Sequence, residues 1–207
     1  MTLPLETDRR PLKIRSARWS RQVAKLLAGL GITPNQISVV SVAFAAAGAI
    51  SLLAGGWFLL VAAACIQGRL LCNLFDGMVA VEHNKATPLG VVYNEFPDRV
   101  ADSLLLIAAG YSVSMSTLGW LAALAAALTA YVRVFGASCG LQHDFRGPMA
   151  KQHRMAVLTI VCVATPLLPF GKRPLVGGLA LIAVLSLLTC VTRTIRLCDQ
   201  LKKNSAP

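Results

Sequence analysis

Acidic residues, aromatic residues and paired cysteines are all scarce in this sequence. Asp and Glu together number 9 against 20 Lys and Arg, and aromatic residues make up 6% of the 207 residues. The six cysteines lie in or beside apolar segments without a C-x-x-C pair, which argues against a disulfide framework and a zinc site. The basic residues are not interleaved with aromatic ones, so we expect no nucleic-acid partner.

A cleavable signal and internal repeats are missing as well. The first thirty residues lack the continuous apolar core and small-residue cleavage site of a signal peptide, so we expect them to be retained. What the chain does have is apolar sequence: 56% of its residues are hydrophobic and the mean hydropathy is +0.64. This composition predicts an integral membrane protein built as one helix bundle. The net charge of +11 lies mostly outside the apolar runs, which suggests membrane orientation and contact with anionic lipid headgroups.

Six apolar segments predict an all-α membrane protein with six transmembrane helices. Most are close to the ~20 residues needed to cross a bilayer. Thr33-Pro34-Asn35 supplies a helix start before the first segment, with threonine as cap and proline in the first turn. The segments cover about 37–54, 57–81, 90–113, 117–138, 155–170 and 175–197. We therefore divide the chain into a basic segment (1–32), a membrane domain (33–198) and a short tail (199–207).

The basic N-terminal segment has the pattern of a helix that lies in the membrane interface. Its apolar residues fall on one helical face and its basic residues lie away from that face. The apolar residues are Trp19, Val23, Leu26, Leu27 and Leu30, and the basic ones are Arg15, Arg18, Arg21 and Lys25. By the positive-inside rule both termini are expected in the cytoplasm, in an inner (cytoplasmic) membrane protein, although Lys172 and Arg173 between the last two segments oppose this orientation.

Four polar residues interrupt segments that are otherwise apolar enough to cross a membrane. Asn73 and Asp76 are three residues apart, and Asn94 and Asp98 are four apart, so each pair lies on one face of its helix. Such groups are costly in hydrocarbon and by default mark a functional interior. Two facing helices with these oxygens can hold a hard divalent cation, Mg²⁺ or Mn²⁺. We therefore expect a metal site near the cytoplasmic surface.

This segment resembles the signature of the CDP-alcohol phosphotransferase (CDP-alcohol phosphatidyltransferase) family. That signature reads D-x-x-D-G-x-x-A-R, eight or more residues, then G-x-x-x-D-x-x-x-D. Every spacing is kept, and the matching residues are Asp76, Gly77, Ala80, Gly90 and Asp98. Asn73 and Asn94 replace the first and third aspartates and Val81 replaces the arginine, as in a bacterial branch of the family with asparagine at both positions.

The resemblance implies that Asn73, Asp76, Asn94 and Asp98 bind metal and that Asp98 is also the general base. In the family two metal ions lie beside the CDP pyrophosphate, and an alcohol hydroxyl attacks the phosphorus distal to cytidine with CMP as leaving group. The expected reaction is transfer of a phosphatidyl group from CDP-diacylglycerol to a small alcohol in phospholipid biosynthesis. A homodimer is implied by the resemblance alone. Gly77, Ala80 and Gly90 are expected at the substrate, although helix packing alone would explain the first two.

Further charged residues form a second layer of candidates for substrate binding. Arg69 precedes Asn73 by one helical turn and could hold a carboxylate or substrate phosphate. Asp102 continues the Asp98 face and should have a cationic partner, with Arg69 and Arg133 as candidates; it or Glu95 could also compensate for the missing carboxylates. Lys151 and Arg154 begin the fifth segment, where cations for phosphate and a positive-inside flank are equally good interpretations.

Three alternatives to this function are open. The reaction could instead run from a soluble CDP-alcohol to diacylglycerol. The substitutions at 73, 81 and 94 would also suit a catalytically silent relative that binds a CDP-lipid or a partner enzyme. A transporter is permitted by the charges within the spans. The acceptor alcohol and the number of metal ions do not follow from the sequence.

Overall fold

The protein is all-helical over the residues that the structure describes, which are 17–82 and 89–204. In this computed structural model the side chains of residues 91 and 94 are also outside the description. The seven helices of the described ranges are α1 (Arg18–Gly29), α2 (Pro34–Ala54), α3 (Phe58–Glu82), α4 (Gly90–Ser112), α5 (Ser116–Ser138), α6 (Lys151–Leu167) and α7 (Arg173–Asn204). The prediction of an all-α protein is confirmed.

The start of α2 shows how local sequence sets a helix boundary. The Thr33 hydroxyl accepts a hydrogen bond from the Gln36 backbone N–H (3.3 Å), and the Gln36 side chain accepts one from the Thr33 N–H (2.9 Å). This reciprocal pair satisfies two backbone donors that a helix start otherwise leaves free. Pro34 occupies the first turn, where its missing N–H has no cost. The predicted helix start at Thr33-Pro34 is therefore confirmed.

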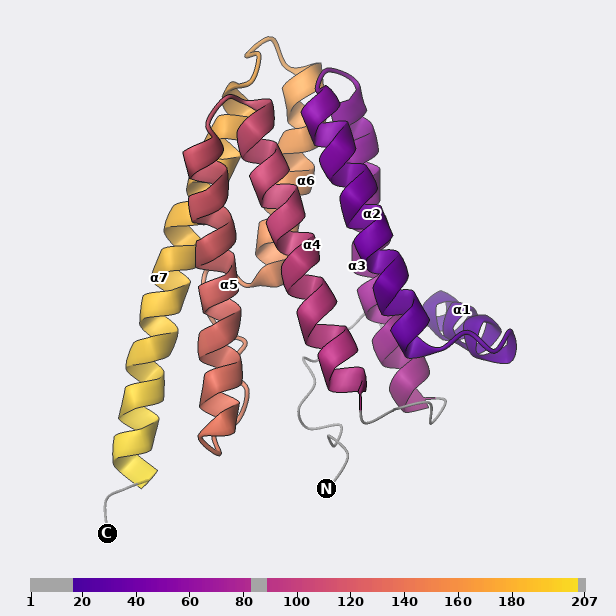
Figure 1. Cartoon of the computed structure of the whole chain (residues 1–207), viewed down its shortest axis with the longest axis vertical. Helices are drawn as coiled ribbons and strands as arrows, with labels where there is room; N and C mark the ends of the chain where they lie inside the picture. Colours follow the sequence, from indigo (N-terminus) through magenta and orange to yellow (C-terminus); the bar gives the residue numbers. More distant parts are fainter. Residues whose placement is uncertain (1–16, 83–88, 205–207) are drawn as a thin grey trace.

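The six long helices form a ring in which each packs against two neighbours. Going round the ring the order is α3, α2, α4, α5, α7 and α6, and the contact between α6 and α3 closes it. α1 lies outside the ring against α3 and points away from the bundle, as Figure 1 shows. α3, α4 and α6 thus enclose the middle of the ring from different sides. This arrangement brings the charged residues of these three helices together.

Four of the described helices are long and apolar enough to cross a membrane: α2, α3, α5 and α7. The other two long helices do not meet that criterion. α6 has only 17 residues, and α4 carries Glu95, Asp98, Arg99 and Asp102 within its 23 residues. Many large apolar side chains on the outside of the ring are exposed, among them Leu53 on α2, Leu124 on α5 and Leu188 on α7. A surface of this kind suits lipid better than water.

Small residues make the close contacts between helices. A Cβ atom built on Gly110 of α4 would lie 2.6 Å from the Gly119 Cα of α5, so the two backbones meet where neither residue has a side chain. Buried alanines, such as Ala62 and Ala122, continue this close packing elsewhere in the core. Small residues are typical of helix contacts in membranes, because they let backbones approach and gain van der Waals contact.

The fifth and sixth predicted segments differ from the helices observed. α6 begins at Lys151 rather than near residue 155, and α7 runs from Arg173 to Asn204, beyond both predicted ends. Hydropathy marks only the apolar part of a helix, and both helices start or end in basic residues. α6 is also short: its N-terminal end lies part-way along the bundle, and the segment after α5 climbs to reach it (Figure 1).

Candidate active site

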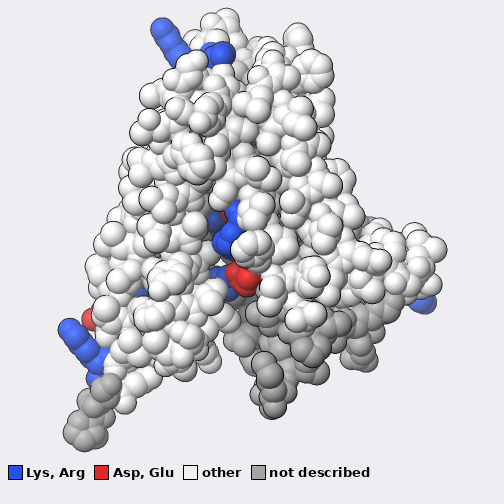
Figure 2. Space-filling model, in the orientation of Figure 1, with Lys and Arg blue, Asp and Glu red and all other residues white. Residues whose placement is uncertain are grey.

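Three helices deliver charged side chains to the middle of the ring. α3 contributes Arg69, Asn73 and Asp76, which are spaced so that they share one face of the helix. α4 contributes Asp98 and Asp102, one turn apart, from the side opposite. Figure 2 shows basic and acidic atoms together in a hollow about half-way along the molecule, with uncharged surface directly around it. The predicted polar interior therefore exists and is open at this face.

Asp98 is held by donors from two other helices. Its Oδ1 accepts a hydrogen bond from the Asn73 side-chain amide (2.8 Å) and lies 3.3 Å from Nη2 of Arg69. Its Oδ2 is bound by the ammonium group of Lys151, at the first residue of α6. The Asp98 side chain is only 11% exposed, whereas Lys151 is 23% exposed and reaches the hollow. Both oxygens of this carboxylate are thus occupied by the protein's own groups.

Asp102 lies deeper and is enclosed between two arginines. Nη2 of Arg69 is 2.6 Å from its Oδ1, and Nη2 of Arg154 is 3.1 Å from its Oδ2. All three side chains are at most 4% exposed. Arg69 is therefore confirmed as the cationic partner of Asp102, and Arg154 is a second partner that the sequence did not predict. With both oxygens engaged, Asp102 has none left to replace a missing metal ligand.

Arg133 is not a partner of Asp102, so that half of the prediction was wrong. Its Nη2 instead binds both carboxylate oxygens of Glu95, at 2.6 and 2.7 Å. Glu95 lies nearly one turn before Asp98, on the side of α4 that meets α5, and Arg99 also contacts it at 3.4 Å. Since Arg133 and Arg99 engage Glu95, this carboxylate is no replacement metal ligand either.

Asp76 differs from the other two carboxylates because it lacks a cation. It is buried, at 5% exposure, and its Oδ2 accepts a hydrogen bond from the Ser38 hydroxyl of α2 (2.8 Å). No cationic group of the described residues lies within ion-pair distance of it. A buried carboxylate without a counter-charge is expensive in a low-dielectric interior. Asp76 therefore suits a cation supplied from outside the chain.

The remaining motif residues lie on α3 and at the start of α4, and their role at the substrate stays a prediction. Gly77 and Ala80 follow Asp76 on α3 and are partly exposed, as is Gly90 at the first residue of α4. Asn94 lies in the second turn of α4, but its side chain is outside the description, so its role as a ligand stays a prediction. Asn73 uses its amide as a donor to Asp98. Only its carbonyl oxygen is left to face a metal ion.

The segment between α5 and α6 fixes the position of Lys151 and Arg154. Gly147 has φ +134°, and a Cβ atom there would lie 2.4 Å from Cγ2 of Thr189 on α7. The Thr189 hydroxyl accepts a hydrogen bond from the Met149 N–H (2.9 Å), and Arg193 donates to the carbonyls of Arg146 (2.8 Å) and Thr129 (2.7 Å). These contacts tie the segment to α7 and draw the start of α6 into the bundle. Lys151 and Arg154 therefore contact carboxylates of the bundle, Asp98 and Asp102, and are more than a basic flank.

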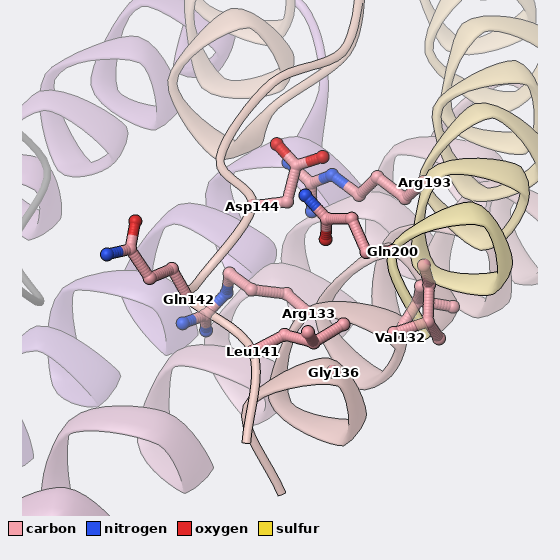
Figure 3. Close-up of a pocket in the computed structure, with 9 residues that line it drawn as sticks. Val132, Arg133, Gly136, Leu141, Gln142, Asp144, Arg193 and Gln200 are labelled. Atoms are coloured by element: carbon pink, nitrogen blue, oxygen red, sulfur yellow. The ribbon is translucent and has the colours of Figure 1, made fainter. Parts of the chain in front are cut away.

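A small pocket with both charged and apolar lining residues lies beside this network, between α5, α7 and the connecting segment. Figure 3 shows Arg133, Asp144 and Arg193 around it, together with Gln142 and Gln200. Partial burial works against the charged form of Asp144, but the hydrogen bonds from Arg146 outweigh it and hold the pKa of Asp144 below its usual range. The pocket adjoins the charged cluster through Arg133, which contacts Glu95 of α4.

Sequence reasoning missed two contributors to the site. Ser38 gives no signal, because a serine in an apolar helix is common in membrane proteins. Arg193 gives a clear signal, because a basic residue within the last apolar segment by default marks a functional or paired group. Arg154 was a candidate for substrate binding, but its ion pair with Asp102 was not predicted. The depth of Arg154 depends on long-range contacts of the preceding segment, which hydropathy does not reveal.

The donor set fits one divalent ion better than two. Asp76 offers a carboxylate without a cation, whereas Asp98 already has one in Lys151. In the part of the chain that the structure describes, no group of three or more His, Cys, Asp or Glu side chains is arranged to hold a metal ion. A hard cation at Asp76 would complete its shell with amide oxygens and water, as Mg²⁺ commonly does.

The fold and the site together define a helical membrane protein with a charged site enclosed by three of its helices. The chain matches the CDP-alcohol phosphatidyltransferase family over residues 31–194 and belongs to that family. The phosphatidylinositol phosphate synthases of Mycobacterium bovis (strain BCG / Pasteur 1173P2) and Mycobacterium tuberculosis (strain ATCC 25618 / H37Rv) are each 25% identical over 195 residues, which cover 86% of this chain and 84% of theirs.

Solved structures show the same fold. The Mycobacterium tuberculosis phosphatidylinositol phosphate synthase with CDP-DAG bound superposes with a TM-score of 0.75 at 21% identity, covering 87% of this chain and 94% of that one. The same enzyme in complex with manganese and citrate also gives a TM-score of 0.75 at 21% identity, over 86% and 88% of the two chains. At this identity the likeness concerns the fold.

Proposed function

We propose that the protein transfers a phosphatidyl group from CDP-diacylglycerol to a small alcohol and releases CMP. The observation that carries this proposal is the position of Asp98, a carboxylate held between cations of α3 and α6 at an open hollow in a membrane helix bundle. Membership of the CDP-alcohol phosphatidyltransferase family supports it, as does the likeness to an enzyme whose structure holds CDP-DAG. A lipid donor can enter such a site from the bilayer while a soluble alcohol enters from water.

Different side chains of the protein would bind the donor phosphate and accept the proton of the acceptor hydroxyl. Lys151 is partly exposed, unlike Arg69 and Arg154, and would bind the pyrophosphate of the donor. Asp98 would accept the proton of the attacking hydroxyl. Gly77, Ala80 and Gly90 leave space beside these groups for the donor. Arg69 and Arg154 are too deeply buried to reach a substrate phosphate, so we assign them to holding Asp98 and Asp102 in place.

A divalent ion, Mg²⁺ or Mn²⁺, would bind at Asp76 with Asn73 and Asn94 as amide ligands. When bound it would supply positive charge that stabilises the negative charge on the transferred phosphate. Ser38 fixes the Asp76 carboxylate through its hydrogen bond to Oδ2. The manganese complex of the Mycobacterium tuberculosis enzyme supports a divalent ion in this fold.

The pocket next to the cluster is the proposed place of the acceptor alcohol. Its lining offers guanidinium and amide groups from Arg133, Arg193 and Gln200, which suit a hydroxyl-rich molecule. Arg133 is fixed by Glu95, one turn from Asp98, so an acceptor bound there would lie near the base. The chemistry of the lining does not distinguish one polar alcohol from another.

We further propose six membrane spans, with both termini on the cytoplasmic side of the inner membrane. α4 and α6 would be the two additional spans, since both lie within the ring formed with the four apolar helices. α1 would lie in the interface, where exposed Trp19, Leu26 and Leu30 can enter the lipid. A homodimer is the proposed assembly.

The direct test is an assay of the purified protein with CDP-diacylglycerol, Mg²⁺ or Mn²⁺ and a panel of small alcohols, with products identified by mass spectrometry. We expect CMP and one new phospholipid. A parallel reaction with CDP-alcohols and diacylglycerol tests the opposite direction of transfer. CMP release only in that reaction, or in neither, would contradict the proposal, and the Asp98→Asn variant serves as the inactive control.

A further inference from the structure

We infer that the ammonium group of Lys151 supplies a permanent positive charge to the site, so that the protein binds one divalent ion and not two. This inference rests on the proposed function, since it concerns the charge that faces the donor pyrophosphate. It starts from the two motif carboxylates that the sequence retains, Asp76 and Asp98. Only one of them lacks a cation among the described residues.

The contacts of Asp98 provide the first argument. Oδ2 is bound by Lys151, and Oδ1 accepts from Asn73 at 2.8 Å with Arg69 at 3.3 Å. A metal ion at this carboxylate would have to displace the lysine and approach a guanidinium. At about 4 Å, a doubly charged ion and one such cation repel each other by several kcal/mol even at an effective dielectric constant of 20. Asp98 is therefore a poor ligand for a metal ion in this chain.

The charge balance of the cluster provides the second argument. The connected cluster holds four carboxylates, Asp76, Glu95, Asp98 and Asp102, and five cations, Arg69, Arg99, Arg133, Lys151 and Arg154. Four negative and five positive charges leave a net charge of +1 before any ion binds. One divalent ion raises this to +3, and the two negative charges of a pyrophosphate diester lower it to +1. A second divalent ion would leave the site at +3 with donor bound, in a low-dielectric interior where uncompensated charge is costly.

The same charge balance explains why asparagines suffice at 73 and 94. Carboxylates at these two positions would be needed only to compensate the charge of a second divalent ion, because Lys151 already supplies positive charge. Asn73 instead donates a hydrogen bond to Asp98, which an aspartate could not do in its charged form. The amide thus suits a site in which the neighbouring carboxylate is already paired.

Donor binding would then also release the base. When the pyrophosphate enters, the Lys151 ammonium can move from Oδ2 of Asp98 to a phosphate oxygen, because its side chain is partly exposed and those of Arg69 and Arg154 are buried. Oδ2 becomes free to accept the proton of the acceptor hydroxyl. The alcohol oxygen then forms its bond to phosphorus, the bond from that phosphorus to the CMP oxygen breaks, and the proton stays on Asp98.

The test is the number of Mn²⁺ ions bound per chain, measured by equilibrium dialysis and electron paramagnetic resonance on the purified full-length protein with and without CDP-diacylglycerol. We expect one ion per chain with the spectrum of an isolated ion, and we expect Asp76→Ala to remove it. Two ions per chain with a coupled spectrum, as for ions about 3.5–4 Å apart, would overturn the inference, and so would no bound ion. This readout does not depend on turnover, so a protein that releases no CMP would contradict the proposed function without deciding the ion count.

Variants test the role of the lysine itself. Lys151→Met should weaken donor binding by roughly tenfold or more, because a charged contact to phosphate is lost. The same variant combined with Asn73→Asp and Asn94→Asp should bind a second Mn²⁺. Lys203→Met, in an exposed lysine at the end of α7, is the matched control and should change neither quantity. Unchanged donor affinity in Lys151→Met would overturn the role of the lysine, and folding of each variant is checked by circular dichroism and gel filtration.

Discussion

At the scale of single residues, the site is a network of buried charges that stabilise one another. Arg69 is fully buried and contacts both Asp98 and Asp102, so it links the base to the deeper ion pair with Arg154. Removing one member of a buried ion pair leaves its partner without compensation, which commonly costs 3–5 kcal/mol. Each of these residues therefore influences stability as well as activity, and tests must separate the two effects.

Asp98→Asn should abolish CMP release while donor binding remains measurable. The amide cannot accept the hydroxyl proton, and loss of general base catalysis typically costs about 10²–10⁴-fold in rate. Donor binding should persist because Lys151 is then free for the phosphate. Rates of CMP release and equilibrium binding of CDP-diacylglycerol are the two measurements. Near-normal turnover in this variant would show that Asp98 is not the general base.

Asp102→Asn should lower the free energy of unfolding by about 3–5 kcal/mol, since two buried arginines lose their counter-charge. The measurement is thermal unfolding in detergent. The matched control is Asp144→Asn, because Asp144 pairs with Arg146, whose side chain is 65% exposed, and such surface pairs contribute about 0–1 kcal/mol.

Combining Asp102→Asn with Arg69→Gln or Arg154→Gln should recover part of the lost stability, because each double variant leaves fewer unpaired charges. Arg133→Gln should show no coupling to Asp102→Asn, since Arg133 contacts Glu95. Strict additivity with both Arg69 and Arg154 would show that the ion pairs do not hold Asp102.

At the scale of elements, the position of α6 decides which cations enter the site. The sequence predicted the helices from hydropathy, the start of α2 from Thr33 and Pro34, and the shared face of Asp98 and Asp102 from helical spacing, with Arg69 as one of two candidate partners of Asp102. Spacing within one helix is a local property, so it can be read directly. The depth of Lys151 could not be predicted in this way, because it depends on contacts between Gly147, Thr189 and Arg193, which are far apart in sequence.

Gly147→Ala should displace the start of α6 and thereby reduce both stability and activity. The new Cβ would meet Thr189 at 2.4 Å, and the backbone has φ +134°. Strain and overpacking together should cost about 2–4 kcal/mol. The thermal midpoint and the rate of CMP release are the measurements. Gly140→Ala, in the same segment at φ +80° with nothing within 4 Å, is the control for backbone strain alone and should cost about 1–2 kcal/mol.

A second substitution can show that the clash causes the effect. Thr189→Ser removes Cγ2 but keeps the hydroxyl that accepts from Met149. Combined with Gly147→Ala it should restore part of the stability and activity. If the double variant is as impaired as Gly147→Ala alone, the backbone conformation of residue 147 and not its contact with α7 sets the position of α6.

At the scale of the whole molecule, the distribution of basic residues indicates how the bundle is oriented in the membrane. The ends of α5 and α7 lie at one end of the bundle in Figure 1, and the connection between α6 and α7 lies at the other. The first end carries Arg146, Arg196, Lys202 and Lys203, whereas Lys172 and Arg173 are at the second. This excess of basic residues favours a cytoplasmic location for the first end. The distribution of basic residues could predict this orientation from the sequence, but it could not show that α6 starts inside the bundle.

The span that most needs a test is α6, because its 17 residues rise only about 26 Å against a hydrocarbon core of about 30 Å. Three positions suffice, each as the single cysteine in a chain whose other cysteines are replaced by alanine: Cys139 after α5, Lys172→Cys after α6, and Cys198 near the end of α7. A membrane-impermeant maleimide should label Cys139 and Cys198 in inside-out vesicles and Lys172→Cys in right-side-out vesicles, since one span separates each neighbouring pair. Labelling of all three from one side would mean that neither α6 nor α7 crosses the membrane. A third outcome is labelling of Cys139 and Lys172→Cys from one side and of Cys198 from the other. In that case α6 would enter the bilayer and return to the same side, so that a re-entrant helix and not a sixth span would cover the site.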